Sequence, residues 1–185
     1  MNRQIHLNII KNNMKKIFLT TLIMVFAMSV YAQSEVCAYI CDKSGTPTNV
    51  RNAPKGKVVK SLPEIDGGYV VTLLEVKNNW WRIDPVIDIY GDEDDYVKLQ
   101  GSKTGYWVHN SVLQFNIAGD HTNVLRATPS SKGKPLKIDT TYLLETGLRP
   151  LQIQGEWIKV ETTDKWFMGW MPIDRICCNP LTTCP

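Results

Sequence analysis

Histidine is scarce in this chain of 185 residues, which has only three. Two of them, His109 and His121, follow the N-terminal region, and neither accompanies a nucleophile motif or a metal-ligand spacing. The cysteines also lack the spacings of a zinc site. These absences predict that the protein is not an enzyme, and they provide no candidate catalytic residue, metal site or cofactor.

The chain also lacks an apolar run suited to a stop-transfer helix. Residues 17–28 are apolar apart from two threonines, and this run is shorter than the roughly 20 residues that cross a bilayer. It follows Lys15 and Lys16 and precedes small residues that end at Ala32, which is the pattern of a secretory signal peptide. We expect residues 1–32 to be a cleaved signal, with Met14 as an alternative start, and no membrane span after cleavage.

An excess of positive charge is also missing once the signal is removed. The signal holds Arg3, Lys11, Lys15 and Lys16 and no acid, so cleavage after Ala32 changes the formal net charge from +3 to −1. Such a balance gives no general attraction to nucleic acid or to anionic lipid. We therefore expect a periplasmic or secreted protein that does not bind nucleic acid.

Five cysteines lie near the two ends of the chain that follows the signal, and export predicts disulfides. Two adjacent ones in the sequence "VCAYICD" are separated by four strand residues, roughly 13 Å, which is too far for a bond between them. We expect at least one of this pair to join the C-terminal group, which would stabilise the fold by about 4–5 kcal/mol. One cysteine is left over. The disulfide candidates are Cys37, Cys41, Cys177, Cys178 and Cys184.

No segment after the signal shows a convincing helical repeat of apolar residues, whereas several show the signs of strands. Residues 69–76, "YVVTLLEV", are rich in β-branched side chains and follow a Gly-rich turn. Residues 80–84 and 106–110 are predicted as short strands, and residues 151–154, "LQIQ", alternate and end at a hairpin signal, Gly155. The fold class indicated is an all-β barrel or sandwich.

The chain repeats itself once. "TNVRNAP" at 48–54 recurs as "TNVLRATP" at 122–129, and the segment 80–83 recurs as 157–160. Last, "GYWVHNSVL" at 105–113 recurs as "GWMPIDRI" at 169–176. The period of about 75 residues is the size of a small domain, so it predicts tandem domains at 33–116 and 117–185.

These motifs together resemble the bacterial SH3-like (SH3b) domain family. The resemblance rests on Asn49, Val50, Arg51, Pro54, Trp80, Ile83, Gly105, Trp107, Val108 and Leu113. Tyr106 is an extra residue in this pattern. The second copy lacks the Asn before its hydrophobe-Arg pair, and its Pro172 replaces the counterpart of Val108. The resemblance implies two tandem SH3-like small β-barrels that bind a ligand, and it points to cell-wall peptide or glycan.

Strand alternation assigns each tryptophan of "WWRID" to a different face. Trp81 and Ile83 are predicted to face the core, and Trp107 and Trp170 are also expected to be buried. The opposite face pairs an aromatic ring with a cation in both copies, which suits a peptide or sugar ligand. An equally good interpretation is that Trp80 and Trp157 cap the open end of the barrel core. The candidate ligand-binding residues are Trp80, Arg82, Tyr106, Trp157 and Lys159.

The first copy contains an acidic insertion between Asp84 and Gly105 that the second copy lacks. Its charged centre has neither the alternating ligands nor the Gly of a calcium loop, so a solvated hairpin tip is favoured. A contact loop for a partner protein is a further alternative. The candidate contact residues are Tyr90, Asp92, Glu93, Asp94, Asp95 and Tyr96.

Three functions remain open from the sequence. The first is a binding protein that recognises peptidoglycan in the envelope. The second is a periplasmic immunity or inhibitor protein that binds a cell-wall hydrolase or toxin, because a protruding charged loop can steer a partner. The third is a structural spacer in an envelope assembly.

Overall fold

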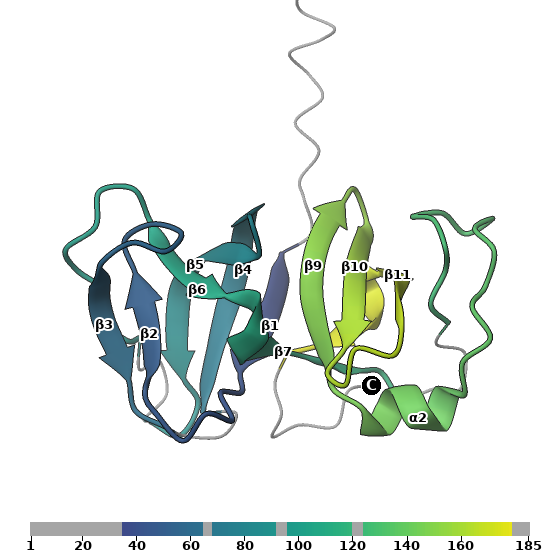
Figure 1. Ribbon diagram of the computed structural model, residues 1–185, viewed down its shortest axis with the longest axis horizontal. Helices are drawn as coiled ribbons and strands as arrows, with labels where there is room; N and C mark the ends of the chain where they lie inside the picture. Colours follow the sequence, from purple (N-terminus) through teal and green to yellow (C-terminus); the bar gives the residue numbers. More distant parts are fainter. Residues whose placement is uncertain (1–34, 65–67, 92–95, 120–123, 179–185) are drawn as a thin grey trace, which may run out of the picture. The chain divides into compact units, whose positions relative to one another are not determined.

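Antiparallel strands form most of the regular structure (Figure 1). The computed structural model describes residues 35–64, 68–91, 96–119 and 124–178. The first half contains β1 (Val36–Ile40), β2 (Thr48–Arg51), β3 (Val58–Leu62), β4 (Tyr69–Lys77), β5 (Trp80–Asp88), β6 (Tyr106–His109), the 3-10 helix η1 (Asn110–Val112) and β7 (Leu113–Gln114). The second half contains β8 (Asn116–Ile117), α2 (Thr140–Glu145), β9 (Leu148–Gln154), β10 (Trp157–Thr162), β11 (Met168–Pro172), the 3-10 helix η2 (Ile173–Arg175) and β12 (Ile176–Cys177).

The strands form three sheets. The largest has the order β3-β2-β6-β5-β4-β1-β7, and the others have the orders β11-β10-β9 and β12-β8. All of the named pairings are antiparallel. The predicted all-β class is confirmed, and the expected strands at 69–76, 80–84, 106–110 and 151–154 correspond to β4, β5, β6 and β9. Among the described strands, no sheet closes into a barrel.

One short helix, α2, forms in the second half, although no segment after the signal shows a helical repeat of apolar residues. Asp139 caps α2, because its carboxylate accepts a hydrogen bond of 2.8 Å from the backbone N–H of Thr141. Six residues are too few to show a helical repeat of apolar side chains, so the sequence carried no periodic signal for this element. None of the helices in the described ranges has the length and hydropathy needed to cross a membrane.

The register of strand pairing repeats between the two halves. In the β5–β6 hairpin Trp80 lies opposite His109, and in the β10–β11 hairpin Trp157 lies opposite Pro172. Pro172 therefore corresponds to His109, and Val108 corresponds to Met171. The sequence comparison that set Pro172 against Val108 was wrong by one position.

The same arginine contact also occurs in both halves. Arg51 donates from Nη1 to the carbonyl oxygen of Gly56, and Arg126 donates from Nη1 to that of Gly133, each over 2.8 Å. In each case the arginine backbone pairs with the strand that carries the buried tryptophan. The arginines of the "V-R" and "L-R" motifs thus stabilise equivalent turns in the two halves.

Each half also pairs its first strand with its last. In the first half β1 pairs with β7, and in the second half β8 pairs with β12. The 3-10 helices η1 and η2 directly precede these last strands. Phe115 joins the halves, since its backbone exchanges two hydrogen bonds of 3.0 and 3.1 Å with the backbone of Leu148 at the start of β9.

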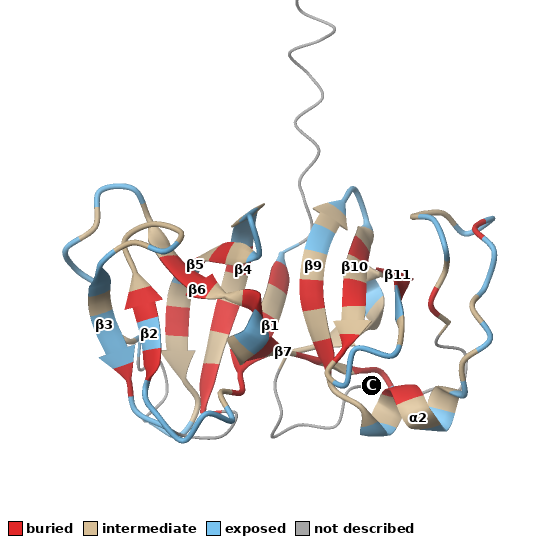
Figure 2. Ribbon diagram, viewed as in Figure 1, coloured by how far each residue is buried: buried red, intermediate tan, exposed pale blue. Residues whose placement is uncertain are grey.

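The core is made by the strand faces that alternation predicted (Figure 2). Trp81 and Ile83 in β5, and Ile158 and Val160 in β10, are all essentially inaccessible to solvent. The other predicted core tryptophans, Trp107 and Trp170, are buried as well. One continuous cluster of buried side chains includes residues from both halves.

Trp81 connects the core of the first half to the second half. Its indole N–H donates a buried hydrogen bond of 3.1 Å to the carbonyl oxygen of Pro150 in β9. Val160 in β10 lies opposite Pro150 and Lys159 lies opposite Gln152, so Leu151 between them is a bulge without a partner. Proline has no backbone N–H, so it is tolerated at such an irregularity. Its carbonyl oxygen accepts the hydrogen bond from the Trp81 indole.

The predicted link between the two ends of the chain is confirmed. Cys37 in β1 forms a disulfide with Cys178, which lies 141 residues further along. Cys177 is also disulfide-bonded, Cys41 is buried, and Cys184 lies outside the described residues.

Removal of the Trp81 hydrogen bond tests its role in joining the halves. Trp81→Phe leaves the Pro150 carbonyl buried without a donor, so we expect the free energy of unfolding to fall by about 1–3 kcal/mol in urea denaturation. Trp80→Phe is the matched control, since Trp80 is half-buried, and it should cost less than about 1 kcal/mol. Equal losses in the two variants would contradict this assignment.

The Cys37–Cys178 bond should contribute strongly to stability because it closes a long loop. The double variant Cys37→Ala, Cys178→Ala is expected to lose about 2–5 kcal/mol in the free energy of unfolding. Peptide mapping without reductant should show the linked peptides in the wild type only. A double variant that unfolds at the same urea concentration as the wild type would refute the expectation.

Candidate functional site

A cleft of about 520 Å³ lies where the two halves meet, and we call it the junction cleft. The first half contributes residues from the β4–β5 turn, the end of β6 and η1, and the second half contributes residues from β9, β10, the β10–β11 turn and β11. Its volume lies within the range of ligand-binding sites. The lining consists of Asn79, His109, Asn110, Ser111, Arg149, Leu151, Gln152, Lys159, Glu161, Lys165 and Met168.

A tight turn between β4 and β5 positions the wall from the first half. Asn78 and Asn79 both have positive φ, at 51° and 66°, as in the two-residue hairpin turn that follows the right-handed twist of the strands. The carbonyl of Asn79 accepts a hydrogen bond of 2.8 Å from the backbone N–H of Asn110. The polar turn before "WW" therefore forms a hairpin turn and also anchors η1 beside the cleft.

The wall from the second half is the outer face of the β9–β10–β11 sheet. Lys159 and Glu161 alternate with the buried Ile158 and Val160 along β10, so they lie on this outer face. Glu161 is opposite Arg149 in β9, and Lys159 is opposite Gln152. The bulged Leu151 also lines the cleft. Hydrophobic alternation along β10 therefore determines which charges face the cleft.

The junction cleft is electropositive. Arg149, Lys159 and Lys165 line it, and Glu161 is the one carboxylate among the described residues of its lining. Within the described ranges, no acidic side chain lies at ion-pairing distance from any of these three cations. Unpaired cations in a partly desolvated hollow attract anions more strongly than cations on an open surface.

His109 is neutral in this setting. Burial, followed by the positive charges of Arg149 and Lys55, lowers its pKa below the ordinary value of 6.5. Its Nδ1 accepts a hydrogen bond of 3.3 Å from the backbone N–H of Ser111, which places the ring proton on Nε2. The Ser111 hydroxyl lies 2.8 Å from the same nitrogen. His109 thereby caps η1 and offers the cleft an N–H donor.

Asn110 is the buried polar residue of the junction cleft. It is 8% exposed, and its carboxamide has no hydrogen-bonding partner among the described residues. A carboxamide carries two N–H donors and an acceptor, and buried groups of this kind are almost always hydrogen-bonded in proteins. The cleft thus contains donors and an acceptor that a bound ligand could satisfy.

A highly exposed tryptophan lies in the β10–β11 turn. Trp166 is 77% exposed, and it lies in sequence between Lys165 and Met168, which both line the cleft. Asp164 organises this turn. Its carboxylate accepts hydrogen bonds from the Thr162 hydroxyl (2.6 Å), from the backbone N–H of Trp166 (3.0 Å) and from the Tyr142 hydroxyl, and the Thr162 and Tyr142 bonds lower its pKa. Trp166 is therefore presented on an ordered turn.

The ligand-binding candidates from the first copy are engaged in contacts with the protein itself. The guanidinium of Arg51 lies 5.8 Å from the centre of the Trp80 ring, and His109 meets this ring edge-on at 5.2 Å. Trp80 therefore packs against His109, a residue of the cleft, and is not itself among the described residues that line it. Tyr106 is half-buried against the core.

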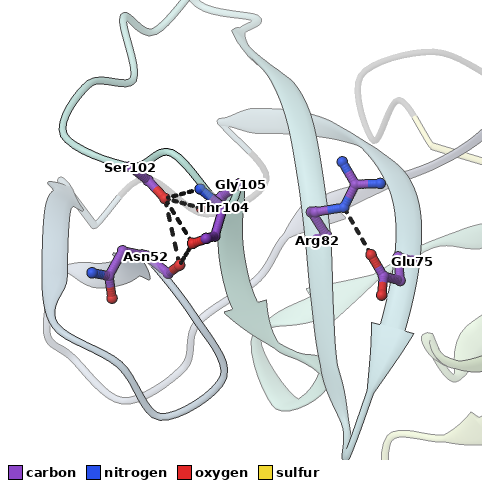
Figure 3. Close-up of polar contacts among 6 residues, drawn as sticks. All are labelled: Asn52, Glu75, Arg82, Ser102, Thr104 and Gly105. Atoms are coloured by element: carbon purple, nitrogen blue, oxygen red, sulfur yellow. Dashed lines mark hydrogen bonds and ion pairs between the residues drawn. The ribbon is translucent and has the colours of Figure 1, made fainter.

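Arg82 forms an ion pair with Glu75 in the neighbouring strand, at 3.0 Å (Figure 3). Its aliphatic stem also lies against Gly105, where an added Cβ would come within 2.5 Å of the Arg82 side chain. Thr104, at the end of the insertion, donates a hydrogen bond of 2.7 Å to the Asn52 carbonyl. Gly105 of the repeat motif thus leaves room for the Arg82 side chain against the backbone. The hydrogen bond from Thr104 to Asn52 holds the end of the insertion in place.

The second copy separates its two candidates. Lys159 lines the junction cleft, whereas Trp157 lines another hollow of about 440 Å³ together with Glu35, Glu156 and Asp174. The aromatic and basic pair predicted from alternation does not form one binding surface here. The pair shares a sheet face, but its members lie along β10 in different hollows.

The candidate contact loop is described only at its ends. Tyr90 and Tyr96 are more than half exposed, and Tyr96 pairs with Ile87 of β5. Asp92, Glu93, Asp94 and Asp95 lie outside the described residues. Within the described ranges, no three His, Cys, Asp or Glu side chains are arranged to hold a metal ion.

Sequence reasoning missed Arg149, Lys165, Trp166 and the role of Asn110. The segment "TTDKW" carried a signal for a turn at Trp166, because Asp side chains favour turns by hydrogen-bonding to the backbone two residues further on. Arg149 and Asn110 gave no signal, since their proximity depends on how the two halves meet.

Comparisons with known proteins provide no family assignment. No family model matches the chain, and no curated protein does. Among solved structures, the chain aligns with "Structure of NlpC1 from Trichomonas vaginalis" at 10% identity and a TM-score of 0.27, over 81% of this chain and 48% of that chain. The chain thus spans about half the length of that protein, and a score this low does not define a shared fold.

The cationic cleft should make stability depend on the titration of His109. Since its folded pKa is lowered, the unfolded chain binds more protons below pH 6.5, so stability is complete above that pH and falls as the pH decreases toward the folded value. NMR titration of the His109 ring should give a pKa below 6.5, and Arg149→Gln should raise it. Lys137→Gln is the control, with no expected change. A pKa at or above 6.5 would contradict the description of this cleft.

Proposed function

We propose that the chain is an exported pair of SH3-like modules that binds peptide or glycan of the bacterial cell envelope, with peptidoglycan as its partner. The repeated order of the arginine turn, the tryptophan hairpin and the 3-10 helix supports two related modules. The Cys37–Cys178 disulfide suits an oxidising compartment outside the cytoplasm. The modules act as a binding protein and not as an enzyme.

The observation that carries this function is the junction cleft. It combines three cations that have no acidic partner in the described part of the chain with the buried Asn110 carboxamide, and an exposed tryptophan, Trp166, adjoins it in sequence. Peptides and sugars present hydrogen-bonding groups and flat apolar faces, which such a combination of donors and an indole ring recognises. Lys159 is the sequence-predicted ligand residue that lies in this cleft, and Trp166 takes the role of aromatic platform that was expected of Trp80 and Trp157.

The proposed function predicts co-sedimentation of the purified protein with isolated peptidoglycan. Trp166→Ala should reduce the sedimented fraction several-fold, because its ring is exposed and contributes little to the core. Tyr90→Ala removes another exposed aromatic ring, which adjoins no cleft-lining residue in the sequence, and it should sediment like the wild type. Wild-type protein that stays in the supernatant would rule out this function.

The runner-up is a periplasmic immunity or inhibitor protein for a wall hydrolase or toxin. It is favoured by the exposure of Tyr90 and Tyr96, at 56% and 57%, at the two ends of the acidic loop. Exposed tyrosines at a charged protrusion are typical anchors of protein interfaces. Capture of one stoichiometric protein by the wild type, lost in Tyr90→Ala and kept in Trp166→Ala, would favour this alternative over envelope binding.

A further inference from the structure

The junction cleft is selective in its charge, and this selectivity indicates a narrower class of ligand than peptide or glycan in general. Neutral sugars need no cation, whereas three cations with a single carboxylate among them favour an anionic group. Arg149 offers a planar fork of N–H donors that matches the two oxygens of a carboxylate. Lys159 and Lys165 supply two further positive charges from β10 and the β10–β11 turn.

We infer that the junction cleft binds the carboxylate of a peptide, held by Arg149 and Lys159, while the Asn110 carboxamide hydrogen-bonds an adjoining peptide group. This inference rests on the proposed function, because it names the chemical group by which that site would recognise its ligand. Lys165 adds long-range attraction at the β10–β11 turn, and Met168 beside it provides an apolar contact for a side chain of the peptide.

The architecture of the cleft accounts for the preference for a peptide carboxylate over a free anion. Asn110 is buried with both a donor and an acceptor unsatisfied within the described part of the chain. A peptide group offers a carbonyl and an N–H to such a carboxamide, whereas a small inorganic anion offers acceptors alone. The neutral His109 adds an N–H donor on Nε2 and no competing charge.

Glu161 opposes ligand binding at this site. It lies opposite Arg149 in the β9–β10 register but outside ion-pairing distance, so it partly offsets the positive potential of the cleft without neutralising the arginine. Its removal should therefore strengthen the binding of an anion. This opposite effect separates an electrostatic role of the cleft from general damage to the fold, which would only weaken binding.

The test compares N-acetyl-alanyl-alanine, which ends in a free carboxylate, with its C-terminal amide, by NMR shift titration of the full oxidised chain. We expect the acid to bind about tenfold more tightly than the amide, the effect of one charge-assisted hydrogen bond. Binding of the acid should also raise the pKa of His109, because a negative charge then lies near its ring. Inorganic phosphate is the third probe and should bind more weakly than the acid.

The variants assign this effect to residues. Lys159→Gln and Arg149→Gln should each weaken binding of the acid by about tenfold, and Glu161→Gln should strengthen it by about two- to fivefold. Lys60→Gln changes an exposed lysine on β3, outside the cleft, and should bind like the wild type. Backbone NMR shifts away from the cleft should be unchanged in all four variants, which shows that they are folded.

Equal binding of the acid and the amide would overturn the inference, and so would phosphate that binds as tightly as the acid. If the wild type co-sediments with peptidoglycan while Lys159→Gln and Arg149→Gln do so equally well, the inference is wrong and the proposed function stands. If the acid binds in the cleft but peptidoglycan does not sediment the protein, the inference stands and the proposed function fails.

Discussion

The buried hydrogen bond from the Trp81 indole to the Pro150 carbonyl is the contact on which the rest of the structure depends. An indole N–H removed from water needs an acceptor, and the acceptor that it has belongs to the other half of the chain. This bond fixes β9 against the β5–β6 hairpin. As a result, the charged face of the second half lies opposite η1, and the junction cleft forms between them.

The β-bulge at Leu151 links this core contact to the chemistry of the cleft. Because Leu151 is unopposed, the side chains of β9 before and after it do not follow simple alternation, and both Arg149 and Gln152 line the cleft. Pro150 occupies the adjoining position, where a missing N–H costs no ladder hydrogen bond. The bulge thus places the Pro150 carbonyl where it accepts the hydrogen bond from Trp81, and it directs Arg149 toward the cleft.

The two halves share features of the fold. Both contain the arginine turn, the buried tryptophan and the 3-10 helix. Their surfaces differ. The first copy has Trp80 covered by Arg51 and His109, whereas the second presents Trp166 to solvent on a turn held by Asp164. Residues from both copies line the cleft, so neither copy alone would form this site.

The sequence by itself determined the all-β class, the core faces of β5 and β10 and the disulfide between the ends, because strand alternation, tryptophan burial and cysteine placement are local or compositional signals. It also singled out Lys159, which lines the junction cleft. Only the tertiary structure decided that Trp157 and Lys159 lie in different hollows, that Arg82 is paired with Glu75, and that Arg149 and Asn110 meet in one cleft. These outcomes depend on how two halves pack and on where a bulge interrupts a register, and neither is encoded by any short pattern of residues.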